Sequence, residues 1–387
     1  MFDWPRIDWR ELRAHRASRL RQLMIDQHLD HLLLTGFDNI RYATDYRVMT
    51  TAENYDWFAA YVDRECDSKI FVPFVDEEVV DPVPSLSNVR AWVATPSWAS
   101  STMHADVYSR VLAREIGSSR ARRVGFDLVP PQILELLRIE LPQVDLVSVA
   151  VELFQLRVEK HPLEVTLLRA ASEVNAIGAD DATAAVAPGL HDYDVLGIAM
   201  GSLQRQGVEY LIHSVCNVRR PSGEWFANGA ELRDGDAFFF DIGCFGAGGY
   251  ASDICRTVFV GEPPTDVTRA YAMLLDAYRA GQERARPGVK VSEIHDATNA
   301  VLEKNGLPRT PYAVGHGIGL RACEWPTIYR PDMVREDATL ESGSTIALEP
   351  ETFVEVGDHV VVLKVEDNFL VTPDGLELLS RAGYGSE

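Results

Sequence analysis

The chain has little of several features that define whole classes of proteins. Its five cysteines are scattered and include no CxxC pair, and this odd number argues against both a disulfide framework and a zinc–thiolate site. No run approaches the roughly 18 consecutive apolar residues that a membrane helix needs. The start, MFDWPRIDWRE, has neither the basic region nor the apolar core of a signal peptide. We therefore expect reduced thiols and a cytoplasmic location.

Basic residues are also scarce, with 37 Lys and Arg against 58 Asp and Glu and a net charge of −21. Such a surface repels phosphate backbones and anionic lipids, so nucleic acid and membranes are not expected partners. A hydrophobic content of 46% with 25% charged residues is ordinary for a globular protein with a sizeable core. At about 150 residues per domain, 387 residues predict at least two domains.

Helical and apolar strand patterns alternate over the first 155 residues and predict an α/β domain. Helices are expected at 10–28 and 131–139, and strands at 31–36, 70–74, 124–126 and 144–149. The segment Asn39-Ile-Arg-Tyr leads into an aromatic stretch from Tyr46 to Tyr61.

A repeat divides the second predicted domain, residues 156–387. A long helical pattern at 160–187 stops at Pro188-Gly189. Pro188-Gly189, Tyr193-Asp-Val and Gly207 recur as Pro287-Gly288, Ser292-Glu-Ile and Gly306, each offset by 99 residues. The shared spacing predicts two duplicated halves, each a helical segment followed by strands.

Two aspartates stand in unusually apolar surroundings. Asp241 follows the run Ala-Phe-Phe-Phe, and Asp253 lies in the next apolar strand after a glycine-rich turn. If these strands form a hairpin, both carboxylates can share one face, where they need a cation to remain charged together. The alternative is that each aspartate simply ends a strand.

Three further candidates follow in the second half. His316 lies between glycines, and Glu349 and Glu366 each end an apolar strand. A lone histidine is usually structural, but two Asp, two Glu and one His suit Mn, Fe, Co or Zn. Four carboxylates need more than one divalent ion, and two ions sharing a water lower its pKa.

The order Asp241, Asp253, His316, Glu349, Glu366 and the motifs around these residues resemble the pita-bread metallohydrolases of metallopeptidase family 24. This group includes creatinase, aminopeptidase P and prolidase. The resemblance implies a creatinase-like N-terminal domain (1–155), a pita-bread catalytic domain with pseudo-twofold halves (156–387), and a homodimer. It also implies that Asp253 and Glu366 bridge two metals, that Asp241 holds one, and that His316 and Glu349 hold the other.

The sequence departs from the proline-specific members at two helper histidines. Cys323 and Glu224 stand at those positions, although such imidazoles move protons during amide hydrolysis. Other groups must then supply acid–base chemistry, or the substrate differs. The candidates that we consider are His213, Tyr312, Cys323 and Glu324, and for His213 and Cys323 a packing role is the alternative.

The replacements around the site are similar to those of DddP-type dimethylsulfoniopropionate lyases, which share Trp225-Phe226 and Glu324-Trp-Pro. Aromatic residues could surround a sulfonium or ammonium group, and two arginines could bind a substrate carboxylate. These candidates are Trp225, Phe226, Trp325, Tyr46, Trp57, Arg219 and Arg220. Core packing is the alternative for each aromatic residue. The chain also lacks the second aspartate of the lyase Asp-x-Asp motif, since Gly243 stands there.

We therefore expect a dinuclear metal enzyme that cleaves a small, cationic or zwitterionic substrate in the manner of these lyases. The first alternative is an Xaa-Pro dipeptidase or aminopeptidase P-like peptidase. The second is a binding module that kept the fold without the chemistry.

Overall fold

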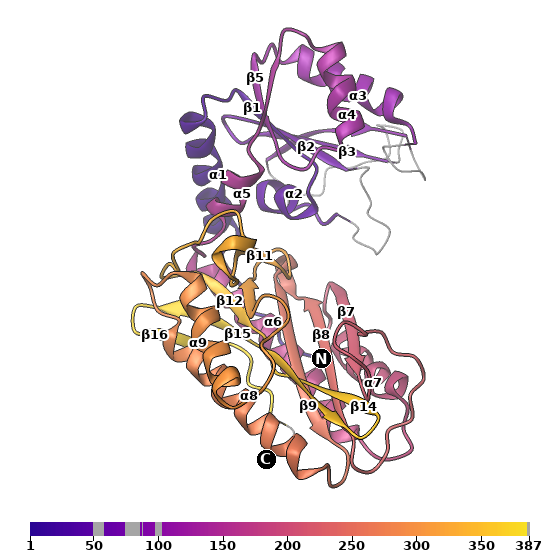
Figure 1. The fold of residues 1–387 in the computed structure, drawn as a ribbon. Coiled ribbons are helices and arrows are strands. Elements are labelled where there is room, and N and C mark those ends of the chain that lie inside the picture. Colours follow the sequence, from indigo (N-terminus) through magenta and orange to yellow (C-terminus); the bar gives the residue numbers. More distant parts are fainter. Residues whose placement is uncertain (49–57, 74–85, 87, 97–102, 385–387) are drawn as a thin grey trace. The chain divides into compact units, whose positions relative to one another are not determined.

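The computed structural model describes residues 1–48, 58–73, 86, 88–96 and 103–384. It contains two compact units, Asp8–Arg157 and a second unit made of Met1–Ile7 with Val158–Glu387 (Figure 1). None of the helices in these described ranges has the length and apolar character that a membrane crossing requires.

The N-terminal unit is a six-stranded sheet with helices, which confirms the α/β prediction for this region. The strand order is β4-β3-β2-β1-β5-β6, with β1 antiparallel to β2 and parallel to β5. Helices α3 and α4 bury apolar residues such as Leu112 and Ile133 in its core. The strands are β1 (His31–Leu34), β2 (Ala59–Asp63), β3 (Ser68–Val72), β4 (Val89–Ala94), β5 (Arg123–Phe126) and β6 (Asp145–Ser148). The helices are α1 (Trp9–Asp26), α2 (Phe37–Thr44), α3 (Ala105–Ser118), α4 (Pro131–Glu140) and α5 (Ala150–Leu156).

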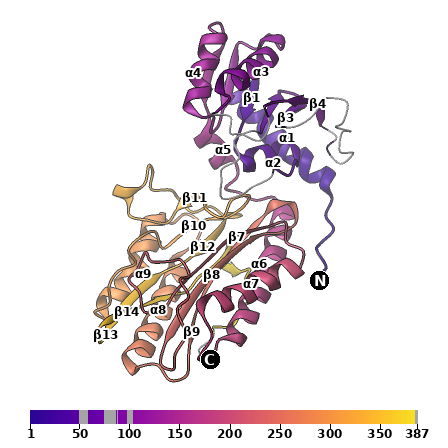
Figure 2. The ribbon, with the colours of Figure 1, turned by 90° about the vertical axis from the view of Figure 1, so that its right-hand side faces the viewer.

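The first half of the second unit packs two helices on a three-stranded sheet. Helices α6 (Pro162–Ala185) and α7 (Asp192–Arg205) cover the antiparallel strands β7 (Tyr210–Asn217), β8 (Ala237–Phe245) and β9 (Ala251–Phe259). All nine residues of β8 are buried, which explains why its sequence is a continuous apolar run. Figure 2 shows this magenta helix pair and the orange pair α8–α9 beside the strands.

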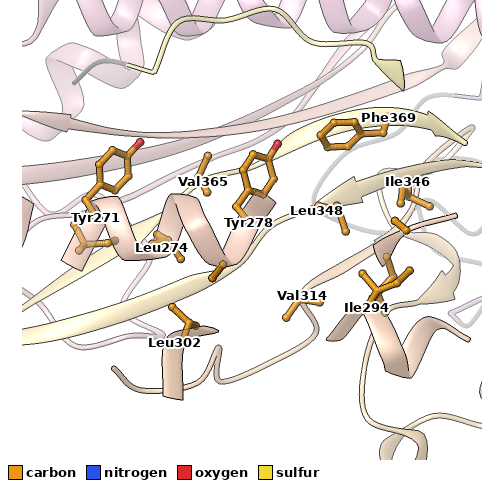
Figure 3. Close-up of a cluster of buried hydrophobic side chains, with 14 of the residues drawn as sticks. Tyr271, Leu274, Tyr278, Ile294, Leu302, Val314, Ile346, Leu348, Val365 and Phe369 are labelled. Atoms are coloured by element: carbon orange, nitrogen blue, oxygen red, sulfur yellow. The ribbon is translucent and has the colours of Figure 1, made fainter. Parts of the chain in front are cut away.

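The second half repeats this plan with helices α8 (Thr265–Arg284) and α9 (Val291–Lys304). Its five-stranded sheet has the order β11-β10-β12-β15-β16, and a separate hairpin pairs β13 with β14. Tyr271, Leu274 and Tyr278 of α8 lie in a core cluster with Leu348 and Phe369 from the strands (Figure 3). The strands are β10 (Gly315–Gly317), β11 (Glu324–Thr327), β12 (Thr345–Leu348), β13 (Glu351–Val356), β14 (His359–Lys364), β15 (Asp367–Thr372) and β16 (Gly375–Leu378).

The predicted duplication is visible in the helices. Helices α7 and α9 begin at 192 and 291 and end at 205 and 304, so both ends are offset by 99 residues. In each helix the third residue, Asp194 or Glu293, has a carboxylate that accepts a hydrogen bond from the backbone N–H three residues earlier. The preceding Gly189 and Gly288 have φ of 89° and 88°, a left-handed conformation that favours glycine.

Asn368 joins the two halves at the centre of the unit. Its side-chain oxygen accepts hydrogen bonds from Asp253 N (3.0 Å) and Ser252 Oγ (2.8 Å). Its side-chain amide donates to Asp253 O (2.8 Å). Beside it, Arg256 of β9 donates to Asp367 at 2.7 Å, with both side chains fully buried. These bonds hold the backbone of Asp253 rigidly against the second half.

Candidate metal centre

The β8–β9 hairpin places Asp241 and Asp253 on one face of the sheet. Gly243 lies opposite Asp253 in the ladder, and Asp241 lies two residues before Gly243 on β8. Residues directly opposite share a face, and so do residues two apart on a strand, so both carboxylates point the same way. The turn between the strands is the short helix η1 (Ala247–Gly249), in which Gly248 has φ of 75°.

His316 enters the same site from β10. The glycines on both sides allow β10 to approach its neighbours closely, because a Cβ on Gly315 or Gly317 would overlap backbone oxygens of β12 and β11. Its Nδ1 lies 3.0 Å from Gly317 O. Its Nε2 lies 3.6 Å from Glu349 Oε1 and 3.7 Å from Glu366 Oε1, so the imidazole faces both carboxylates.

The five residues predicted as metal ligands therefore converge on one place. Glu349 directly follows β12, and Glu366 lies between β14 and β15, where its backbone bridges to Cys255 of β9. Two groups of side chains have ligand atoms within 4.8 Å of one another. These groups are His213, Asp241 and Asp253, and Asp253, His316 and Glu366, and they share Asp253.

The cluster opens on a cavity of about 290 Å³. Apolar and aromatic side chains form part of its wall, and the charged groups gather on the remainder. The lining residues are His213, Val215, Trp225, Phe239, Asp241, Asp253, Tyr312, His316, Cys323, Glu349, Lys364 and Glu366.

Lys364 is a buried cation within this cluster, and we predicted no role for it from the sequence. Its Nζ lies 2.5 Å from Asp241 Oδ2, 2.9 Å from Glu349 Oε2 and 3.5 Å from Glu366 Oε2. Lys364 lies two residues before Glu366, so the two-residue period of a strand was a signal that could have found it.

The charges of the cluster alter its pKa values in opposite directions. Burial alone would raise the pKa of Asp241, but the charge of Lys364 and a hydrogen bond from His213 hold it below its usual range. Burial and the nearby charge of Asp253 raise the pKa of Glu366 well above its usual value. Burial alone would lower the pKa of His213, yet Asp253 and Asp241 raise it well above the ordinary value. The site thus gathers four carboxyl groups, two imidazoles and one lysine in a small space.

The donor set fits divalent cations. Glu366 Oε1 is buried and has no hydrogen-bond partner, and the same holds for Asp253 Oδ1. Buried carboxylate oxygens without hydrogen bonds are costly, and a cation with oxygen and imidazole ligands would satisfy them.

The candidate acid–base residues lie in different surroundings. Tyr312 lines the cavity and donates to Glu351 Oε2 at 2.6 Å, and burial raises the pKa of its phenol well above the usual value. Cys323 lines the cavity with an exposed side chain. His213 Nε2 lies 3.0 Å from Asp241 Oδ1. Glu324 is not among the lining residues, and it accepts hydrogen bonds from Leu320 N and Lys160 Nζ.

The predicted substrate-binding residues are dispersed. Trp225 lines the cavity and packs edge-on against Tyr312 at 5.8 Å, whereas Phe226 is 76% exposed. Trp325 packs against the core cluster of the second half. Tyr46 packs in the N-terminal unit against Phe58 and Trp92. Trp57 lies outside the described residues.

The two predicted substrate arginines have structural partners. Arg219 pairs with Asp236 and donates to Glu231 O, and Arg220 donates to Phe226 O and Cys216 O. Neither is among the residues that line the cavity. Glu351, which we did not predict as a site residue, also has two side-chain partners near the cavity, Tyr312 and Ser222.

Comparison with known proteins matches both units. The model of metallopeptidase family M24 matches residues 166–373, and the creatinase/prolidase N-terminal domain matches residues 16–158. The putative dipeptidase YkvY of Bacillus subtilis is 29% identical over 240 residues, 61% of this chain and 64% of YkvY. The probable dipeptidase PepE of Mycobacterium tuberculosis is 38% identical over 146 residues, 38% of this chain and 37% of PepE.

A solved structure supports the same fold. The Xaa-Pro dipeptidase from Bacillus anthracis aligns with a TM-score of 0.78 at 20% identity, covering 96% of this chain and 98% of that one. At this identity the likeness concerns the fold alone.

The comparisons overturn the first functional prediction. The relatives carry dipeptidase names, so the prediction of a lyase acting on dimethylsulfoniopropionate was wrong. The second unit gives a physical reason, because Trp225 lines the cavity, whereas Trp325 packs against the core cluster and Phe226 is largely exposed.

The family prediction is confirmed. With the family model matching more than half of its length and a creatinase/prolidase domain before it, the chain belongs to metallopeptidase family M24.

Proposed function

We propose that the protein is a metal-dependent dipeptidase. The observation that carries this proposal is the convergence of four carboxylates, three of them buried, and two imidazoles on one small cavity. The dipeptidase names of the relatives and the membership in a metallopeptidase family support the same reaction class. The chain matches 64% and 37% of the length of these two relatives, so the activity of the whole protein is our proposal.

We further propose that the site holds two divalent ions, with Asp241, Asp253, His316, Glu349 and Glu366 as ligands. With metals bound, the ligands are deprotonated, so four carboxylates (−4), neutral imidazoles and the ammonium of Lys364 (+1) leave a charge of −3. One divalent ion leaves −1, whereas two ions give +1, which an anionic nucleophile would balance. Charge balance in a buried site therefore favours two bound ions over one.

Bound ions would supply a Lewis acid for the scissile carbonyl and an activated water. Lys364 keeps Asp241 and Glu349 in place through its two short contacts. Val215, Phe239 and the ring of Trp225 form an apolar part of the cavity wall.

Proton movement must use other groups than the helper histidines of proline-specific relatives. Tyr312 lines the cavity and its hydroxyl donates to Glu351, and burial raises the pKa of that carboxyl group. We assign this pair to hold and deliver the proton that the leaving amine needs.

The cavity favours short substrates. Its volume of about 290 Å³ lies at the lower end of the roughly 300–1,000 Å³ that is typical of ligand pockets. Xaa-Pro dipeptides are the first candidates because of the Xaa-Pro dipeptidase among the structural relatives.

The direct test is a peptide panel. Metal-loaded protein is incubated with Gly-Pro, Ala-Pro, Ala-Ala and Ala-Pro-Ala, and released amino acids are quantified by mass spectrometry. We expect hydrolysis of at least one dipeptide, loss of hydrolysis in Asp253→Asn, and poor hydrolysis of the tripeptide. Metal binding without turnover of any dipeptide would contradict the proposal and favour the binding-module alternative.

We also propose a homodimer, which the family resemblance implies, and a cytoplasmic location. Light scattering after size-exclusion chromatography tests the first, and cell fractionation tests the second.

A further inference from the structure

Strand β7 carries a one-residue bulge beside the cluster. Leu211 pairs with Cys244 of β8 and Ser214 pairs with Ile242, so Ile212 and His213 both oppose the single residue Gly243. Bulges of this kind redirect side chains and are common next to active sites. Here the bulge is the local feature that carries His213.

Gly243 leaves the room that the imidazole occupies. A Cβ at this position would lie 3.0 Å from His213 Cε1 and 3.1 Å from Ile212 Cβ, closer than ordinary van der Waals contact. Gly243 is also the residue directly opposite Asp253. The ring of His213 therefore stands over Gly243, beside both aspartates.

The contacts of the ring are those of a ligand. His213 Nε2 lies 3.0 Å from Asp241 Oδ1 and 3.1 Å from Asp253 Oδ1. One imidazole nitrogen carries at most one proton and donates along one direction, so it hydrogen-bonds well to one of these oxygens. Asp253 Oδ1 accordingly has no hydrogen bond, although it is buried. A cation between the three atoms would satisfy all of them.

We infer that His213 is an additional metal ligand, bound through Nε2 to the ion that Asp241 and Asp253 hold. This inference rests on the metal centre of the proposed function. It gives each ion one imidazole, His213 on one side and His316 on the other. Imidazole suits Zn, Co or Fe better than Mg or Ca, so the site at His213 selects for a transition metal.

The competing role is a hydrogen bond from His213 to Asp241 without contact to the ion. This role would keep the imidazole outside the coordination sphere. The two roles differ in the number of nitrogen ligands per metal, which can be measured independently of activity.

The test is X-ray absorption spectroscopy of the Co²⁺-loaded protein together with chelator competition. With two ions bound, we expect about one imidazole per cobalt in the wild type and about half that number in His213→Gln. We expect the affinity for one of the two ions to fall about tenfold or more.

Two further variants sharpen the test. Gly243→Ala keeps His213 but crowds its ring. It should therefore also weaken the binding of one of the two ions and lower the number of imidazole ligands per cobalt. It serves as the second test if His213→Gln does not fold. His295→Gln is the matched control, because His295 is buried in α9, has Nδ1 3.1 Å from Asp296, and does not line the cavity.

The outcomes separate the two proposals. Unchanged imidazole number and affinity in His213→Gln would overturn this inference while leaving the metal centre intact. Failure of the wild type to bind cobalt would remove the proposed metal centre itself.

Discussion

Replacing Lys364 by methionine should destabilise the metal-free protein far more than the metal-loaded protein. The substitution keeps an unbranched side chain and removes the positive charge that contacts Asp241, Glu349 and Glu366. In the metal-free protein Lys364 is the lysine that neutralises this buried cluster, so its loss leaves like charges together. In the loaded protein the ions supply most of the neutralising charge.

The magnitude follows from the cost of breaking a buried ion pair, about 3–5 kcal/mol. For a unit of this size, each kcal/mol corresponds to about 2–4 °C in melting temperature, so the metal-free variant should melt about 6–20 °C lower. The loaded variant should lose less. Because metal binding recovers the difference, the apparent metal affinity should rise, by about tenfold for each 1.4 kcal/mol recovered.

Differential scanning calorimetry of both forms, with and without a chelator, measures this effect. Lys160→Met is the matched control, because Lys160 is also buried and lies 3.4 Å from Glu324, which does not line the cavity. The control should lose similar stability in both forms. Equal losses in both forms of Lys364→Met would refute the proposed link between Lys364 and the metals.

Three other predictions concern protons, thiols and the joint between the halves. Metal affinity should fall as the pH decreases from about 8 to 6, because the pKa of His316 is raised well above its usual value, and protons then compete for the ligand. Burial alone would lower this pKa, but a hydrogen bond to Cys323 and the charges of Glu349 and Glu366 outweigh it. Chelator competition at several pH values measures this effect, and an affinity that does not change with pH would count against the histidine ligands. In the folded protein Cys323 should react first with a thiol reagent at pH 8, since the other four cysteines are buried. Burial also raises the pKa of Cys66 to about 11 and that of Cys216 to about 12, which leaves about a thousandth or less of each as thiolate. Rapid modification of two or more thiols would contradict this assignment. Arg256→Met should cost about 3–5 kcal/mol in urea unfolding, because it leaves Asp367 buried without its guanidinium partner. A loss below about 1 kcal/mol would mean that Tyr278 and Ser380, which also contact Asp367, are sufficient.

The sequence predicted the elements whose signals are periodic. The 99-residue offset became the matched helices α7 and α9 because glycine turns and capping carboxylates are local features. Asp241 and Asp253 were recognisable because unpartnered aspartates are rare in apolar strands, and the hairpin register then places both on one face.

The side chains around the cavity were harder to predict. Trp325 and Arg219 are residue types expected in a substrate site. In the structure Trp325 packs against the core cluster and Arg219 pairs with Asp236. Only three-dimensional contacts distinguish these structural roles from substrate binding. The place of His213 depends on a bulge of one residue, for which the sequence offers no compositional signal. The two-residue period of a strand places Lys364 on the same face as Glu366, but we did not use this signal to predict a role for Lys364.

The central claim is that this centre hydrolyses dipeptides with metals held by Asp241, Asp253, His316, Glu349 and Glu366. The most direct measurement is titration of Co²⁺ or Mn²⁺ into chelator-treated protein while the release of free amino acids from a dipeptide is followed. We predict that hydrolysis is absent without metal and saturates close to two ions per chain. Hydrolysis that persists without metal, or bound metal with no hydrolysis of any dipeptide, would contradict the account.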